Sequence, residues 1–534
     1  MLLAAQSGEG GSVVGATLRS PSSLRWPWPR ASRSADRFFD HKLKMRGLSR
    51  TTKLLIIVVV VACSALILLN MFELNNIKET TKPAQSIKPK VLNQPKYVVY
   101  TKDGKTGHLK HVYNVMRRLG YEEAQIEENW DVLWSHPYPF TILPALKHLQ
   151  PHQKVNHFPG SGFITNKANL ATMDIPYVPK AFRLPKDKQL LFEHVKRNPK
   201  KVFVQKSNHH RGIQISNVNE LDLSANGTFV QEYVDRPLLV DGYKFDIGVY
   251  TILTSVDPLR VYIYNGDVLF RFCPEKYHPF DPKVVDKYVI GDDYLPTWKV
   301  PSLKKYFTDG GFSMKESFDA YMREIGKEPE KVWKAVKSAI QEVYLRTEMS
   351  ILNLLSQYKT KRTFYEMVRF DFVIDEDLNV FIMEANMSPN LSSQHFPPNS
   401  ILYEQVLYSL LSLVGVGQNV HKQSLLRTKE DIIMQVNSKQ TGVYPEICGT
   451  RCETCMAPEC QICQRCLTAD MKHTLESAYL EHINRHECRR VFPPPMVSVL
   501  KQYSVKQECS IIIINICTYT DSERGSTELR FGFL

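Results

Sequence analysis

The segment that most constrains the fold is 366-EMVRFDFVIDEDLNVFIMEAN-386, in which two apolar, aromatic-rich runs flank a short polar one. The apolar runs predict two β-strands, and the turn-rich residues 375-DEDLN-379 between them predict a β-hairpin. Facing residues of a hairpin have position numbers of constant sum, and a turn centred near Asp377 makes that sum about 754 or 755. Asp371 then faces residue 383 or 384, and the second register pairs it with Glu384.

Strand alternation places Asn386 on the same face as Glu384, so the hairpin gathers Asp371, Glu384 and Asn386 in one patch. Two carboxylates and an amide oxygen, with water and phosphate completing the shell, suit Mg²⁺ rather than Zn²⁺. Mg²⁺ held in this way usually accompanies a nucleoside triphosphate. The alternative for an isolated E-x-N pair is an edge strand with a solvated polar face.

A strongly apolar run lies near the N-terminus, at 54-LLIIVVVVACSALILLNMF-72. Its length of roughly 28 Å as a helix matches a bilayer core, so we expect a transmembrane helix, with a buried core helix as the alternative. Residues 1–53 contain ten Lys and Arg against three Asp and Glu. This basic tail is predicted to be disordered, although a transit peptide has the same character. The charge bias weakly favours a cytosolic N-terminus and a lumenal main body, a type II orientation.

The remaining patterns predict a mixed α/β (α+β) protein. Strand, helix and strand signals between 97 and 135 indicate a small N-terminal α/β lobe, and apolar strands are expected at 201–206, 228–234, 245–254 and 259–266. A long helix is expected from about 329 to 359. We expect a linker at 73–95, a main domain at 96–415, a cysteine-rich segment at 416–490 and an unassigned tail at 491–534.

Several polar residues follow or interrupt these strands. Lys206 ends a strand before a short loop that contains Gly212, and together they could form a triphosphate cradle or a solvated turn. In 231-QEYV-234, a strand end offers backbone groups that could address an adenine edge. Lys244 and Asp246 share one face of the next strand, either as an ion pair or as substrate contacts.

Taken in order, 157-HFPGSGFITNKANLA-171, 230-VQEYVDRPLLVDGYKFDIGVYTIL-253, Arg271 and 366-EMVRFDFVIDEDLNVFIMEANMSP-389 resemble the tubulin–tyrosine ligase-like branch of the ATP-grasp ligases. The resemblance covers about residues 95–415 and implies an ATP-grasp fold. It implies a reaction in which ATP phosphorylates a carboxylate and the amine of an amino acid then attacks the acyl-phosphate. The implied substrates are free glutamate and the acidic tail of tubulin or another protein; no nucleic-acid partner is expected.

The resemblance also implies a role for each matching residue. ATP phosphates would contact Lys167 and Lys206, while the adenine pocket would be lined by Gln231, Glu232 and the backbone of Val234. Lys244 and Asp246 would lie near nucleotide and acceptor, and Arg271 would stabilise the phosphate or acyl-phosphate. Mg²⁺ would bind to Asp371, Glu384 and Asn386.

The chain departs from the family pattern in three places. The pattern K-F-D-L-R ends in arginine, where this chain has Gly248. The H-L-T-N motif expected after the Arg271 strand is replaced by 288-YVIGDDYLPTW-298, and the loop after Lys206 is shorter and less glycine-rich. These departures concern acceptor recognition more than ATP binding. The alternative to an active ligase is therefore a membrane-anchored pseudoenzyme that binds nucleotide or a partner without ligation.

Six cysteines lie between Cys448 and Cys466, with repeated C-x-x-C spacing. So many cysteines in so short a segment exceed what packing requires and predict that they are cross-linked by disulfides or by a bound metal ion. Zn²⁺ would be favoured in a cytosolic chain and disulfides in a lumenal one, so the sequence leaves both open.

Overall fold

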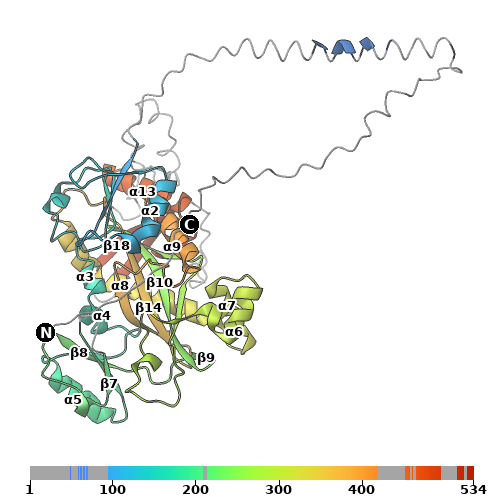
Figure 1. The fold of residues 1–534 in the computed structure, drawn as a ribbon. Coiled ribbons are helices and arrows are strands. Elements are labelled where there is room, and N and C mark those ends of the chain that lie inside the picture. The colour runs from blue at the N-terminus through green and yellow to red at the C-terminus, as the bar shows by residue number, and fades with distance from the viewer. Residues whose placement is uncertain are drawn as a thin grey trace, which may run out of the picture. The chain divides into compact units, whose positions relative to one another are not determined.

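The computed structural model describes residues 94–207, 213–417, 452–456, 460, 463 and 465–494, together with the strands at 514–521 and 526–533 and a few positions before residue 70. Contacts divide the chain into Met1–Leu92 and Asn93–Leu534. The second unit combines β-sheets with helices packed against them (Figure 1), so the predicted mixed α/β class is confirmed.

The central sheet has eight strands in the order β13-β12-β10-β11-β16, with β14 and β9 also paired to β10 and β15 paired to β14. Their bounds are β9 (Leu239–Val240), β10 (Tyr243–Val256), β11 (Leu259–Tyr264), β12 (Leu269–Phe272), β13 (Leu295–Pro296), β14 (Glu366–Ile374), β15 (Val380–Asn386) and β16 (Cys488–Phe492). Strand β10 is rich in aromatic and β-branched residues and is almost entirely buried, as expected for a central strand covered on both faces.

The predicted hairpin is formed by β14 and β15. Asp371 pairs with Glu384 in the register expected, although a shift follows immediately between Asp371 and Phe372. The turn is fixed locally, because the Asp375 carboxylate accepts hydrogen bonds from the backbone N–H groups of Asp377 and Asn379 at 3.0 and 2.8 Å. The sequence therefore predicted both the strands and the pairing at the residues that matter.

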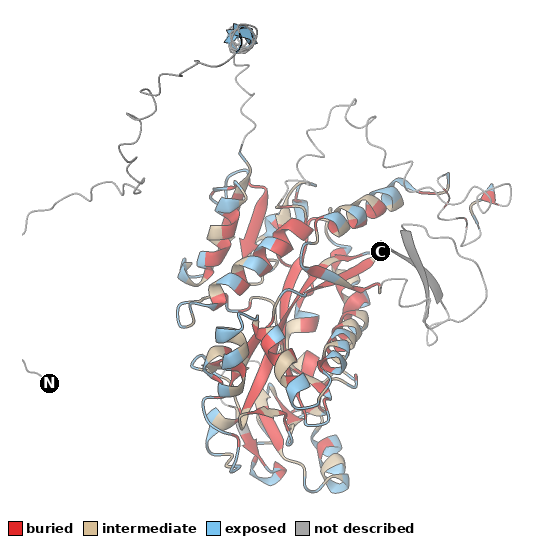
Figure 2. Cartoon of the chain, turned by 90° about the vertical axis from the view of Figure 1, so that its right-hand side faces the viewer, coloured by how far each residue is buried: buried red, intermediate tan, exposed pale blue. Residues whose placement is uncertain are grey.

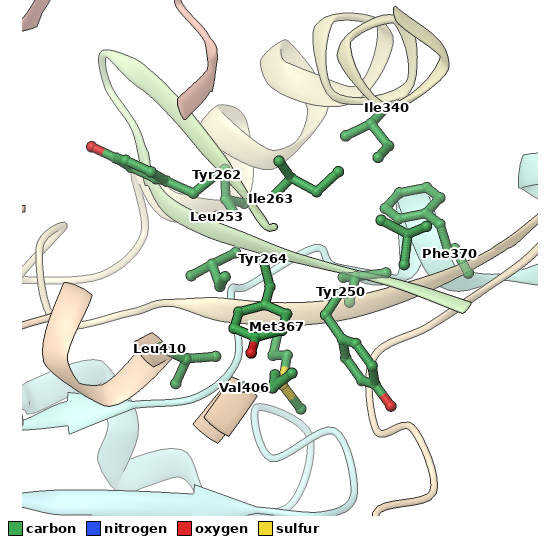
Figure 3. Close-up of a cluster of buried hydrophobic side chains, with 14 of the residues drawn as sticks. Tyr250, Leu253, Tyr262, Ile263, Tyr264, Ile340, Met367, Phe370, Val406 and Leu410 are labelled. Atoms are coloured by element: carbon green, nitrogen blue, oxygen red, sulfur yellow. The ribbon is translucent and has the colours of Figure 1, made fainter. Parts of the chain in front are cut away.

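Two helices cover the central sheet: α8 (Pro329–Leu355) on one face and α9 (Asn399–Leu413) on the other. In Figure 3, Ile340 of α8 lies toward Phe370, while Val406 and Leu410 of α9 lie toward Met367 and Tyr264. Figure 2 shows that buried residues run along these strands and the inner sides of the helices. Asp371 follows Met367 by four positions along β14, so it lies on the face of the sheet that α9 covers.

Two smaller sheets flank the central one (Figure 1). The N-terminal sheet has the order β2-β1-β3-β4 and is parallel, and the other has the order β5-β8-β6-β7 and is antiparallel. Their elements are β1 (Lys96–Tyr100), α2 (Lys110–Arg118), β2 (Glu122–Glu123), β3 (Val132–Ser135), β4 (Lys154–Val155), α3 (Gly162–Thr165), α4 (Lys167–Ala171), β5 (Ala181–Arg183), α5 (Lys188–Arg197), β6 (Phe203–Ser207), β7 (Gln214–Ser216) and β8 (Thr228–Glu232). Two further helices, α6 (Pro301–Lys304) and α7 (Met314–Glu324), follow β13.

The C-terminal segment is joined to the central sheet. Strand β16 pairs with β11, and α13 (Ala469–Ile483) places Glu481 against the buried Arg260, with N–O distances of 2.9 and 3.0 Å. Farther along the chain, β17 (Ile514–Asp521) and β18 (Ser526–Phe533) form an antiparallel hairpin. Residues set apart in the sequence as a cysteine-rich segment thus contribute an edge strand to the main sheet.

The cysteines of this segment form disulfides rather than a zinc site. Cys452 is bonded to Cys460 and Cys455 to Cys466, and Cys463 is also disulfide-bonded. Within the described residues, no cluster of three or more His, Cys, Asp or Glu side chains could hold a metal ion. The zinc alternative is therefore corrected, because the thiolates it requires are used in S–S bonds; Cys448 lies outside the described residues.

The predicted membrane segment 54–72 lies mostly outside the described residues. The positions that are described, such as Val58, Val61 and Leu68, are helical and exposed. In the part of the chain that the structure describes, no helix has both the length and the apolarity needed to cross a bilayer.

Candidate active site

One face of the central sheet gathers most of the polar residues singled out in the sequence. Asp246 on β10 pairs with Arg271 on β12, and Asp371 on β14 pairs with Glu384 on β15. Directly opposed residues in antiparallel strands project to the same face, and Asn386 follows Glu384 by two positions. Strands β10 and β12 and the distant β14–β15 hairpin therefore bring the arginine–aspartate contacts and the hairpin patch together.

Arg271 bridges the two aspartates. Its guanidinium donates to Asp246 through Nε at 2.9 Å and Nη2 at 2.6 Å, and Nη2 also donates to Asp371 Oδ2 at 2.9 Å. Charge-assisted forks of this kind are short, directional and strong. Arg271 is thus held rigidly at the centre of the face, between the two carboxylates.

The two aspartates have opposite pKa shifts. Burial raises the pKa of Asp246 to about 6, against the opposing effect of Arg271. Burial acts in the same direction on Asp371, but the guanidinium groups of Arg369 and Arg271 outweigh it, so the pKa of Asp371 lies below its ordinary value. Asp371 is therefore an ionised oxygen ligand at neutral pH, the form in which a carboxyl group binds a hard cation.

Two lysines lie next to this face, the buried Lys244 and the half-buried Lys206, and both direct their ammonium groups to neutral oxygens. Lys206 Nζ donates to Gln231 Oε1 at 3.1 Å, and Lys244 Nζ donates to the carbonyl of Tyr288 at 2.6 Å, over the ring of Tyr233. Burial lowers the pKa of both, that of Lys206 to about 8. Since the described residues place no carboxylate in salt-bridge contact with either lysine, the pair is prepared to receive an external anion.

Lys167 is the first residue of α4, where the side chain of Asn166 caps the helix by accepting from Asn169 N–H. Its ammonium group lies 2.9 Å from Glu384 Oε1. The predicted phosphate ligand and the predicted metal ligand are therefore paired with each other in this structure. A bound Mg–triphosphate would supply each of them with an opposite charge.

The proposed adenine-pocket residues behave differently from one another. Gln231 is buried, and its side chain donates to the carbonyl of Pro179 at 3.2 Å while accepting from Lys206, so it positions that lysine. The carboxylate of Glu232 turns toward α5, where it lies 2.5 Å from His194 Nε2. Glu232 and Val234 can therefore address an adenine edge only through their backbone or apolar atoms.

The chemistry of these residues fits a Mg–nucleotide. Asp371, Glu384 and Asn386 supply hard oxygen ligands, and Lys167, Lys206 and Lys244 supply the positive charge that a triphosphate requires. The acceptor capacity left on Asp371 is uneven: Oδ2 receives hydrogen bonds from Arg271, Arg369 and Asn386, whereas Oδ1 receives one from Arg369. Among the described donors, this leaves Oδ1 with the greater capacity for a further partner.

The sequence reasoning missed Arg369, Tyr233 and the carbonyl of Tyr288. Arg369 was visible as a basic residue two positions before Asp371 in a mostly apolar strand. Tyr288 belongs to the segment that replaces the H-L-T-N motif, and here its carbonyl holds Lys244. The loop 208–212, which includes Gly212 of the expected phosphate cradle, lies outside the described residues.

Comparisons with known proteins identify the family of this chain. The Tubulin-tyrosine ligase family model matches residues 145–423. A protein of Caenorhabditis elegans named probable tubulin polyglutamylase ttll-15 is 46% identical over 400 residues, which cover 72% of this chain and 78% of that protein. The human tubulin monoglutamylase TTLL4 is 27% identical over 370 residues, 65% of this chain and 30% of its own length. The mouse tubulin polyglutamylase TTLL6 is 25% identical over 361 residues, 64% of this chain and 42% of its own length. The chain thus covers less than half the length of these two mammalian relatives. By sequence, the chain belongs to the tubulin-tyrosine ligase family, a family of ATP-dependent ligases.

Proposed function

We propose that this protein uses ATP and Mg²⁺ to join the amine of glutamate to a carboxylate of an acidic protein segment. The observation that carries the proposal is the sheet face on which Asp371 and Glu384 face each other beside two lysines with neutral partners. Carboxylates for a hard cation next to lysines for an anion are what phosphoryl transfer requires. The family supplies the reaction class.

The chain's own residues would act mainly by electrostatics and positioning. Lys206 and Lys244 would bind the phosphate oxygens, and Arg271, fixed by Asp246, would stabilise charge on the transferring phosphoryl group. Asp371, Glu384 and Asn386 would hold Mg²⁺, which offsets the negative charge of the triphosphate.

The proposed reaction has two steps. The acceptor carboxylate takes the γ-phosphoryl group, which gives an acyl-phosphate and ADP. The glutamate amine attacks the acyl carbon, the amide bond forms, and inorganic phosphate and a proton leave. Arg271 is suited to both steps because the same phosphoryl oxygens carry the charge throughout.

Tubulin is our first candidate for the acceptor, because the relatives are named for glutamylation of tubulin. A second candidate, an acidic protein of an oxidising compartment, is favoured by the disulfides Cys452–Cys460 and Cys455–Cys466. We further propose that residues 54–72 anchor the chain as a single pass of type II orientation, which would place the ligase domain with the second candidate.

Incubation of the full-length chain with Mg-ATP, labelled glutamate and purified tubulin or acidic peptides tests the proposal. Label should enter the acceptor in the wild type and not in Glu384→Gln. Stabilisation by Mg-ATP without incorporation into any acceptor would favour the pseudoenzyme. Digestion of a C-terminal epitope on intact microsomes without detergent would contradict the lumenal orientation and leave tubulin as the acceptor.

A further inference from the structure

The space above Gly248 is occupied by the side chain of another residue of the site. A Cβ added to Gly248 would lie 2.9 Å from Arg369 Cδ and 3.3 Å from Arg369 Nε. Gly248 on β10 pairs with Asp371 on β14, and Arg369 lies two residues before Asp371 on the same face of that strand. The side chain of Arg369 thus extends across to β10, where only a glycine leaves it room.

Arg369 is fixed in this position by its contacts. It is 6% exposed, and its Nε and Nη2 donate to Asp371 Oδ1 and Oδ2 at 2.7 and 2.9 Å. Together with Arg271 and Asp246 it completes a largely buried group of two arginines and two aspartates with no net charge. A buried fork of this kind sets the orientation of the carboxylate that it binds.

The chain has a glycine on β10 at the position that the side chain of Arg369 approaches. The family pattern K-F-D-L-R places an arginine at the position of Gly248, and this chain has none there. The structure fills that space from the neighbouring strand. The glycine at position 248 and the arginine at position 369 therefore belong to one arrangement, because the glycine leaves room for the arginine side chain.

We propose that Arg369 is the positioning residue of the metal-binding carboxylate in this chain: it delivers from β14 a guanidinium that the family pattern delivers from β10, and orients Asp371 toward Mg²⁺. The inference rests on the proposed function, since it assigns Asp371 to Mg²⁺. It also explains why Gly248 does not by itself mark an inactive relative.

Transposing the arginine tests the proposal. The probe is ADP with increasing Mg²⁺, read as the thermal stabilisation of the full-length chain. Arg369→Gly should raise the Mg²⁺ concentration for half-maximal stabilisation about 10- to 100-fold, the usual cost of losing a residue that orients a metal ligand. Gly248→Arg alone should also weaken binding, because its side chain meets Arg369. The double variant Gly248→Arg/Arg369→Gly supplies the guanidinium from β10 instead. Its Mg²⁺ concentration for half-maximal stabilisation should be at least tenfold lower than that of Arg369→Gly.

Two further variants separate positioning from folding. Arg369→Lys keeps the charge but not the fork, and should lie between the wild type and Arg369→Gly. Arg236→Leu removes an exposed arginine that contacts Asp377 in the turn of the same hairpin, and should leave the Mg²⁺ titration unchanged.

The possible outcomes are distinct. An unchanged titration in both Arg369→Gly and Arg369→Lys, or a folded double variant no better than the single ones, would overturn the inference while leaving the proposed function intact. Absence of any stabilisation of the wild type by Mg²⁺ with nucleotide would overturn both.

Discussion

Replacing Glu384 by glutamine is expected to remove most of the stabilisation that Mg-ATP gives to this protein. The substitution keeps the size of the side chain and removes one of the two carboxylates that face each other across β14 and β15. A neutral amide offsets the charge of Mg²⁺ less well than a carboxylate does. The fold should be little affected, because the Glu384 side chain is 28% exposed and its contact with Lys167 is a partly solvated ion pair.

The size of the effect follows from linkage. At a Mg-ATP concentration of about 100 times the dissociation constant, binding stabilises the native state by about 2.7 kcal/mol. A hundredfold loss of affinity would leave about 0.4 kcal/mol at the same concentration. Without ligand, the variant should lose no more than about 1 kcal/mol, because partly exposed ion pairs contribute little.

Thermal unfolding measured with and without Mg-ATP gives both quantities. The matched control is Glu324→Gln, which removes the carboxylate of another glutamate–lysine contact, 2.6 Å from Lys305, at the solvated surface. The control should keep the full stabilisation by ligand. If Glu384→Gln also kept it, Glu384 would not be a ligand of the bound metal and our interpretation of the hairpin would be refuted.

Three other results are expected. Burial lowers the pKa of Lys206 to about 8, and its ammonium group must be charged to bind phosphate, so Mg-ATP affinity should fall as the pH rises from 8 to 10; Lys206→Met should weaken this dependence, and an unchanged slope would contradict it. Glu481→Leu should lower the free energy of unfolding, measured in urea, by about 3–5 kcal/mol, because it leaves the buried Arg260 without its carboxylate. A decrease below about 1 kcal/mol would show that the fold does not depend on α13. Non-reducing peptide mapping should recover Cys452 joined to Cys460, whereas full alkylation of the native protein would exclude that bond.

The sequence alone was sufficient for the β14–β15 hairpin. The hairpin depends on residues that are close in the chain: the apolar residues of its two strands and the turn whose backbone Asp375 holds. Such local patterns determine which side chains share a face, so they are enough to pair Asp371 with Glu384.

What lay beyond the sequence depends on which distant strands become neighbours. The fork from Arg369, the space above Gly248 and the turning of Glu232 toward α5 each require the position of a second element. The cysteine pairing and the addition of β16 to β11 are of the same kind. The spacing of residues predicts which face of a single helix or strand is buried. The contacts named here arise only when two elements pack against each other. The tertiary structure therefore decided how the carboxylates are held, because the charges that hold them come from other strands.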